Sequence, residues 1–143
     1  MSVGDERSEA RERTLNLLYE AASRSVDPRA ALAGQVIDVD PLTDTLVRGV
    51  ADDLARIDGL ISGRAKDWSL DRMPLVDLCV MRLGVFELLE RDDVPVAVIL
   101  DEAVELAQRF STESSGRFVN GVLAAIARDL GRLSDTRTDE PVE

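Results

Sequence analysis

Apolar residues recur every three or four positions along most of the chain, and this period predicts α-helices. A first helix is expected over Glu6–Ser23 and a short second one over Arg29–Ala33. The stretch Leu75–Leu89 is apolar on nearly every face, which is typical of a helix enclosed by others. The pattern therefore predicts an all-α fold in which Leu75–Leu89 is the most buried element.

Residues that commonly cap helices set several of the expected boundaries. Thr43 or Asp44 is expected to cap a long helix that continues to Ile61. Ser114 or Ser115 is expected to cap the last helix, which follows a short turn.

The stretch Val94–Leu100 has alternating valines, which would suit a strand. However, Pro95 is well placed for the first turn of a helix, and helical spacing continues from there to Phe110. We therefore expect a helix in this region. In the last helix, Gly121 is expected to permit close contact with a neighbouring helix.

The length of 143 residues suits a single domain, and an apolar fraction of 45% is enough to build its core. We expect residues 1–133 to form this domain and residues 134–143, which are mostly polar and acidic, to be a disordered tail. The longest uncharged stretch, Phe118–Ala127, is about half as long as a membrane span requires. Since no signal peptide precedes the first helix, a soluble cytoplasmic protein is expected.

Residue types needed for catalysis are scarce. The chain has no histidine and one cysteine, Cys79, which excludes His-dependent catalytic sets, His-ligated metal centres and an intramolecular disulfide. Adjacent acids such as Asp52 and Asp53 point about 100° apart on a helix, so they do not converge on one reacting atom. A glycine-rich phosphate loop is also missing. We expect a binding protein without enzymatic activity, metal or cofactor.

The charge balance bears on nucleic acid. The 17 Lys and Arg stand against 28 Asp and Glu, and the net charge of −11 opposes indiscriminate binding to phosphate but permits a local basic patch. Arg7 and Arg11 lie four apart on one face of the first helix. The acids interleaved along this segment, Asp5, Glu6, Glu9 and Glu12, make a salt-bridged, exposed helix the simpler interpretation of this segment alone.

The last helix is different, because residues 114–133 carry a net charge of +2. Arg117 and Phe118 lie at its N-terminus, where free backbone N–H groups favour phosphate. An aromatic ring beside an Arg is a plausible seat for an unstacked base. Periodicity alone favours Phe118 as a core residue, so both interpretations stay open.

Five short segments occur in an order and spacing that resemble the NusB family of bacterial transcription antitermination factors. They read DRMPLVD at 71–77, MRLGVFELL at 81–89, DVP at 93–95, DEAVELA at 101–107 and FVNGVL at 118–123. Ala10-Arg11 followed by Leu18-Tyr19 is similar to the family's first helix. No single segment is diagnostic, but together and at this chain length they are highly specific.

The resemblance implies two packed helical bundles that form one compact domain of about seven helices. NusB proteins bind boxA, a single-stranded RNA signal in ribosomal RNA leaders, together with the small-subunit ribosomal protein NusE. That complex joins other Nus factors on RNA polymerase and supports ribosomal RNA transcription. The implied role involves no catalysis, no cofactor and no membrane.

The resemblance also implies residue roles. The residues matching the family's RNA path are Arg7, Arg11, Tyr19, Arg117 and Phe118. Those matching its contact surface for NusE are Asp77, Arg82 and, more weakly, Glu87.

Three alternatives stay open. Glutamates dilute the basic first helix, so an RNA-independent protein-interaction module on the same helical fold is one rival. Another is the accessory domain of an RNA methyltransferase, which would need a separate catalytic polypeptide. Some family members form homodimers, so the resemblance leaves both a monomer and a homodimer open.

Overall fold

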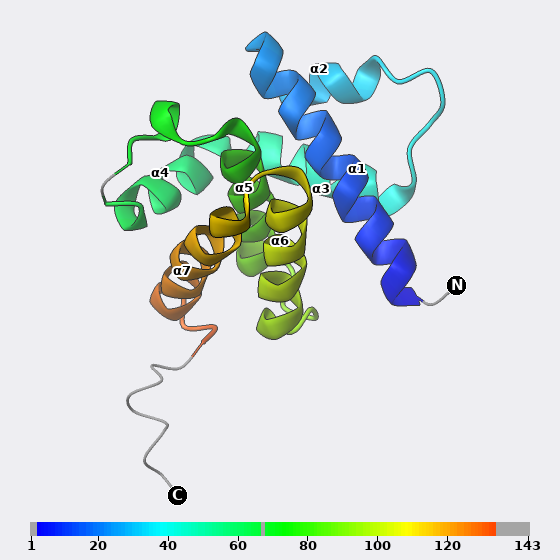
Figure 1. The fold of residues 1–143 in the computed structure, drawn as a ribbon. Helices are drawn as coiled ribbons and strands as arrows, with labels where there is room; N and C mark the ends of the chain where they lie inside the picture. The colour runs from blue at the N-terminus through cyan, green and yellow to red at the C-terminus, as the bar shows by residue number, and fades with distance from the viewer. Residues whose placement is uncertain (1–2, 67, 134–143) are drawn as a thin grey trace, which may run out of the picture.

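Helices make up most of the computed structural model, which describes residues 3–66 and 68–133, with side chains from Glu6 onward (Figure 1). The helices are α1 Val3–Arg24, α2 Pro28–Ala33, α3 Pro41–Asp52, α4 Leu54–Arg64, the 3-10 helix η1 Leu70–Arg72, α5 Leu75–Glu90, α6 Val96–Phe110 and α7 Glu113–Asp129. Within these ranges no strand occurs, which confirms the all-α prediction. The predicted tail, residues 134–143, lies outside the described residues.

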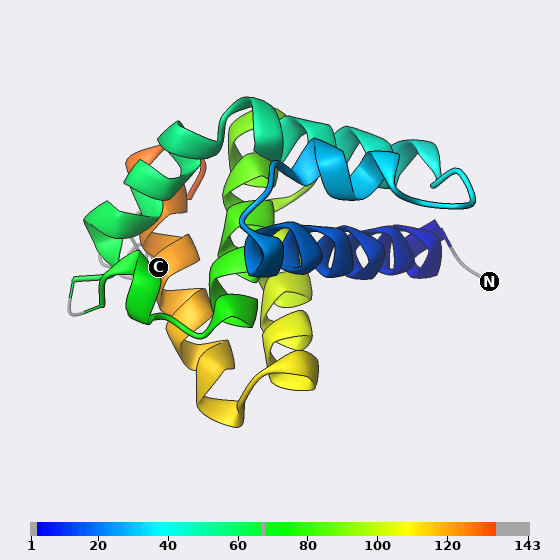
Figure 2. The same ribbon diagram turned by 90° about the horizontal axis from the view of Figure 1, so that it is seen from above.

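Helix α5 is the centre of the fold (Figures 1 and 2). It packs against α1 and α3 on one side and against α4, α6 and α7 on the other. Eleven of its 16 residues are buried, because an apolar surface on every face is covered only when helices surround it. The prediction for Leu75–Leu89 is confirmed, and the two groups of helices share α5.

The predicted cap of the second long helix is wrong. Asp40, not Thr43 or Asp44, caps α3, and its side chain accepts hydrogen bonds from the backbone N–H of Thr43 at 3.0 Å and from the Thr43 hydroxyl at 2.7 Å. Pro41 takes the first helical position, where its missing N–H costs nothing. The predicted helix is also two helices, because the chain leaves helical geometry at Asp53.

The observed cap of the last helix also lies before the predicted cap in the sequence. Thr112 caps α7 and forms a capping box with Ser115, whose side chain accepts from the Thr112 backbone N–H. The prediction of Ser114 or Ser115 as the cap is therefore wrong by two or three residues. By contrast, the predicted helix after Pro95 is confirmed, since α6 starts at Val96.

Close helix contacts depend on Gly49 and Gly84 rather than on Gly121. A Cβ at Gly84 would lie 2.8 Å from Leu123 Cδ1, and one at Gly49 would lie 2.2 Å from Phe86 Cε1. A Cβ at Gly121 would meet no atom within 4 Å, so that expectation is wrong. Gly84 is what brings α7 close to α5.

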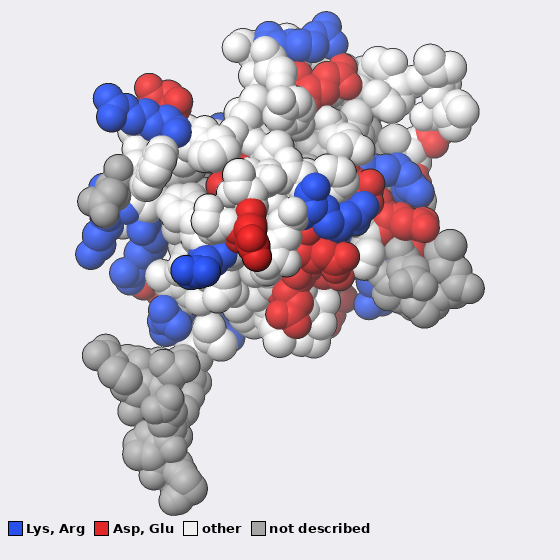
Figure 3. All heavy atoms as spheres, in the orientation of Figure 1, with Lys and Arg blue, Asp and Glu red and all other residues white. Residues whose placement is uncertain are grey.

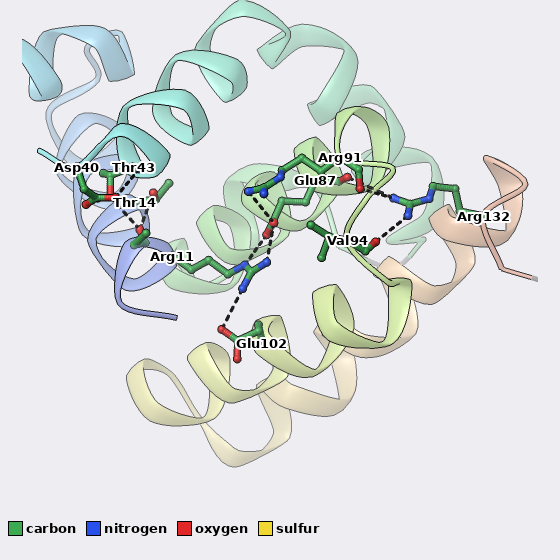
Figure 4. A network of polar contacts seen from close by, with 10 residues as sticks. Arg11, Thr14, Asp40, Thr43, Glu87, Arg91, Val94, Glu102 and Arg132 are labelled. Atoms are coloured by element: carbon green, nitrogen blue, oxygen red, sulfur yellow. Dashed lines mark hydrogen bonds and ion pairs between the residues drawn. The ribbon is translucent and has the colours of Figure 1, made fainter. Parts of the chain in front are cut away.

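A buried ion pair fastens α1 to the centre of the fold (Figure 4). Arg11 on α1 donates to Glu87 on α5 through Nε at 2.8 Å and Nη2 at 2.9 Å, and both residues are no more than 2% exposed. A third nitrogen, Nη1, donates to Glu102 on α6 at 3.4 Å. One guanidinium therefore joins three helices.

Arg132 holds the C-terminal end of α5, close to Glu87 (Figure 4). Its guanidinium donates to the carbonyl oxygens of Leu88 at 3.2 Å and Val94 at 2.9 Å, with longer bonds to those of Glu87 and Arg91. The last carbonyls of a helix have no partner inside it, so a cation here satisfies them and suits the helix dipole.

The electrostatics of the Arg11 site favour the charged state. Burial opposes the charge and would lower the pKa of Arg11, but the hydrogen bonds and charges of Glu87 and Glu102 outweigh this effect, and the pKa is raised. A buried pair of this kind makes the stability of the fold sensitive to mutation, because removal of one partner leaves the other charge buried without compensation.

We predict that Arg11→Met lowers the free energy of unfolding by up to about 3–5 kcal/mol, because Glu87 then stays buried with only the long 3.8 Å ion pair to Arg91. The double variant Arg11→Met/Glu87→Leu should recover most of that loss. The matched control is Arg48→Met, which breaks an exposed pair with Asp44 on one helix and should cost about 0.5 kcal/mol or less. Urea unfolding followed by circular dichroism measures all three. Equal losses for Arg11→Met and Arg48→Met would contradict a structural role for Arg11.

Candidate nucleic-acid interface

Ion pairing divides the cations of the chain into two classes. Most form a salt bridge with an acid of the same chain: Arg11, Arg13, Arg24, Arg29, Arg48, Arg56, Arg64, Arg82, Arg91 and Arg109. A phosphate would have to displace a carboxylate from each of these residues.

Six further described cations form no ion pair with any described residue: Arg132 donates to backbone carbonyls instead, and the other five are exposed. They are Arg7, Lys66, Arg72, Arg117 and Arg128. These five are the best candidates for binding an external anion, because none of them has to give up a partner within the described part of the chain.

Four of the five belong to one side of the molecule. Lys66 follows α4, Arg72 ends η1, and Arg117 and Arg128 lie on α7. Arg117 and Arg128 are eleven residues apart, close to three turns, so they share a face of α7. Lys and Arg gather over α4 and α7 in Figure 3, whereas Asp and Glu gather over α6. We call the face that carries Lys66, Arg72, Arg117 and Arg128 the α4–α7 side. It is locally basic although the protein as a whole is acidic.

Asp129 does not neutralise this side, because it is engaged by another residue. Its carboxylate accepts two hydrogen bonds from Arg64, one of them 2.8 Å long. The hydrogen bond from Arg64 is the main cause of the lowered pKa of Asp129. The neighbouring Arg128 is left without an ion pair.

The three predicted RNA-binding residues on α1 differ in how accessible their side chains are. Arg7 is exposed and lines a shallow hollow of about 370 Å³ with Arg13 and Asp40. Tyr19 is 43% exposed and available for contact. Arg11, however, is the buried partner of Glu87, so a phosphate cannot reach its guanidinium in this conformation. Arg11 therefore has a structural role in the free chain, and its predicted contact with RNA stays a prediction.

The other two predicted RNA residues adjoin each other at the start of α7. Arg117 is exposed and unpaired among the described residues, whereas Phe118 is partly buried and packs against the main core. Phe118 also lines a hollow of about 260 Å³ together with Trp68. The two interpretations of Phe118 are thus compatible, since one part of the ring faces the core and another faces the hollow.

The predicted partner residues offer little free charge. Glu87 is held by Arg11, and Asp77 is 2% exposed and accepts a hydrogen bond from Ser115. Arg82 reaches the surface in part but donates to both oxygens of Asp58, at 2.8 and 2.9 Å. In this conformation, neither Asp77 nor Glu87 presents its charge to another protein.

Other features of the described chain do not support a catalytic or metal site. No group of three His, Cys, Asp or Glu residues in residues 3–66 and 68–133 could hold a metal ion. Burial raises the pKa of the Cys79 thiol to about 11, so little thiolate exists at neutral pH. A hollow of about 710 Å³ between α6 and α7 is lined by three acids, Asp101, Glu105 and Glu113, and by one cation, Arg117, so acids outnumber cations there and phosphate is disfavoured.

No helix of the described chain is long and apolar enough to cross a membrane.

Comparison with known proteins gives consistent matches. The NusB family model matches residues 8–128. The transcription antitermination protein NusB of Saccharopolyspora erythraea is 49% identical over 136 residues, which cover 91% of this chain and 92% of that protein. The protein of the same name from Sorangium cellulosum is 47% identical and covers 92% of this chain and 98% of its own length.

Solved structures agree with the sequence matches. T. maritima NusB has a TM-score of 0.78 and 34% identity, covering 94% of this chain and 96% of its own. A chain from the crystal structure of antitermination factors NusB and NusE in complex with dsRNA has a TM-score of 0.73 and 27% identity, covering 86% and 96%. With this fold and these relatives, the chain belongs to the NusB family of transcription antitermination factors.

Proposed function

We propose that this chain binds boxA-type single-stranded RNA together with NusE and thereby supports ribosomal RNA transcription by RNA polymerase with other Nus factors. The observation that carries the proposal is the group of five exposed cations that form no ion pair with the described residues, four of them on the α4–α7 side. Family membership gives this surface its expected ligand. A solved structure of NusB and NusE in complex with dsRNA supports the choice of RNA and partner.

A local basic surface can bind RNA even though the net charge of the chain is −11. Charges farther apart than about 8–10 Å are largely screened at physiological ionic strength, so nearby cations dominate the interaction with a bound phosphate. The remaining acids still slow the approach of RNA from a distance. A modest affinity for RNA alone, increased by NusE, is the expected combination.

For NusE, we propose a contact at the Arg82–Asp58 pair. Of the three predicted partner residues, only Arg82 keeps part of its side chain at the surface, 16% exposed beside an Asp58 that is 23% exposed. A half-buried pair that a partner covers completely becomes stronger, because water no longer screens it.

The rival function, an RNA-independent protein-interaction module, has one observation in its favour. With Arg11 buried and Arg13 paired to Asp40, Arg7 is the only cation in the first half of α1 that forms no ion pair with the described residues. RNA-binding measurements on the α4–α7 side decide between the two functions.

We predict that Arg117→Ala and Arg128→Ala each weaken binding to a boxA-type RNA and reduce the log–log salt slope by up to about 0.7, the value for one phosphate contact on a single strand. The matched control is Arg24→Ala, since Arg24 is exposed but paired with Glu20, and it should change neither quantity. Fluorescence anisotropy over a range of salt concentrations, with and without NusE, provides the test. Unchanged RNA binding in both variants with NusE present would favour the protein-interaction rival.

A charge swap tests the proposed partner contact. Arg82→Asp should weaken NusE binding by about 2–5 kcal/mol, since it removes one partner of a desolvated pair. The double variant Asp58→Arg/Arg82→Asp restores an internal pair in the reverse orientation, so it should recover thermal stability but not NusE affinity. Calorimetric titration with NusE measures the affinity. Full recovery of affinity in the double variant would show that the pair is only structural.

A further inference from the structure

The outer face of α7 carries two cations with nothing bulky between them. Arg117, Gly121, Ala124 and Arg128 follow one another at helical spacing, so they form a single line along the helix, which we call the α7 stripe. Arg117, Gly121 and Arg128 are exposed, and Ala124 is partly buried. A Cβ at Gly121 would meet no atom within 4 Å. An extended chain can therefore lie against the α7 stripe and reach both guanidinium groups.

Neither guanidinium of the α7 stripe is engaged within the described part of the chain. Arg117 and Arg128 form no ion pair there, and Asp129, the acid beside Arg128, is held by Arg64. Two exposed cations without partners, on a chain with a net charge of −11, favour an anionic occupant.

The chain itself supplies an acidic segment beside this face. Residues 134–143 contain four acids and one cation, namely Asp135, Asp139, Glu140, Glu143 and Arg137. Leu133, the last described residue, lies four residues beyond the end of α7 at Asp129. The segment is therefore tethered next to Arg128, and a tether this short gives it an effective concentration on the order of 1 mM at the α7 stripe.

The spacing of the acids matches the spacing of the cations. Arg117 and Arg128 are separated by about 16 Å along the helix axis, at a rise of about 1.5 Å per residue. Asp135 and Glu140 are separated by about 16–18 Å when the chain between them is extended. A segment that turns back along α7 therefore brings one acid to each end of the α7 stripe.

We propose that residues 134–143 bind along the α7 stripe and compete with RNA for its two cations. Asp135 pairs with Arg128, and Asp139 and Glu140 pair with Arg117. Exposed ion pairs are individually weak, so the segment occupies the stripe for part of the time and RNA displaces it.

The competition rests on the proposed RNA-binding function, whereas the binding of the segment to α7 does not. An occupied stripe lowers the apparent affinity for RNA by the fraction of chains in which it is accessible. An RNA that is also held by NusE displaces the segment more readily than an RNA that meets this chain alone, because its phosphates are then tethered too. The segment thus increases the dependence of RNA binding on NusE.

Binding of the segment can be detected without RNA. Cys79 is fully buried, so a thiol-reactive spin label attaches only at the introduced thiol of Val142→Cys, a substitution that removes no charge. At low salt, the label should broaden the amide NMR signals of the first two turns of α7 more than those of its last turn. High salt, which screens exposed ion pairs, should reverse this order.

Neutralisation of the segment is the specific control for this contact. The variant Asp135→Asn/Asp139→Asn/Glu140→Gln should lose the broadening at the first two turns and keep it near the tether. Broadening that is strongest at the last turn of α7 in the unneutralised chain would overturn the proposal and leave the proposed function intact.

RNA affinity tests the competition. The same triple variant should bind a boxA-type RNA about threefold to tenfold more tightly at low salt, since the α7 stripe is then always accessible. The matched control, Glu90→Gln/Asp92→Asn/Asp93→Asn, makes the same change in net charge at three exposed acids that form no ion pair with the described residues. The control should change the affinity much less.

Equal gains in the two triple variants would show that the segment repels RNA by its charge alone, and would overturn the competition. If no RNA binds with or without NusE, the proposed function and the competition are both wrong, and the spin-label broadening still decides whether the segment binds α7.

Discussion

The buried ion pair between Arg11 and Glu87 is the constraint on which the arrangement of helices depends. It lies where α1, α5 and α6 meet, and the guanidinium uses three nitrogens to join them. Displacement of α1 along α5 by one turn would leave two charges buried without partners, which apolar packing alone would not penalise so strongly. The pair therefore fixes the register of α1 and the position of Arg7 and Tyr19 at the surface.

The basic residues of the chain fall into two groups, those that stabilise the fold and those that remain exposed. Ten Arg residues are committed to acids of the same chain, and Arg132 to backbone carbonyls, so most of the basic residues stabilise the fold. The exposed cations outside these pairs lie mainly on the α4–α7 side. The net charge of −11 thus describes the whole molecule but not the surface that we propose for RNA binding.

Much of the fold could be predicted from the chain, because helical periodicity and the apolar α5 are local signals. The site could be predicted only in part. In the sequence, the cations Arg7, Lys66, Arg72 and Arg128 have no acid three or four residues away, which predicts that they form no local ion pair. The same is true of Arg11 and Arg82, which nevertheless form ion pairs in the fold. Their partners, Glu87 and Asp58, are 76 and 24 residues distant, so the pairing arises only in the folded chain.

Hydrogen–deuterium exchange with and without boxA-type RNA and NusE tests most directly whether the α4–α7 side, rather than Arg11, meets the RNA. Addition of RNA to the complex with NusE should slow exchange at η1 and in the first two turns of α7. Amides around Arg11 should be unchanged, because that residue is already held in the interior. Protection confined to α1, with none at the start of α7, would contradict the account.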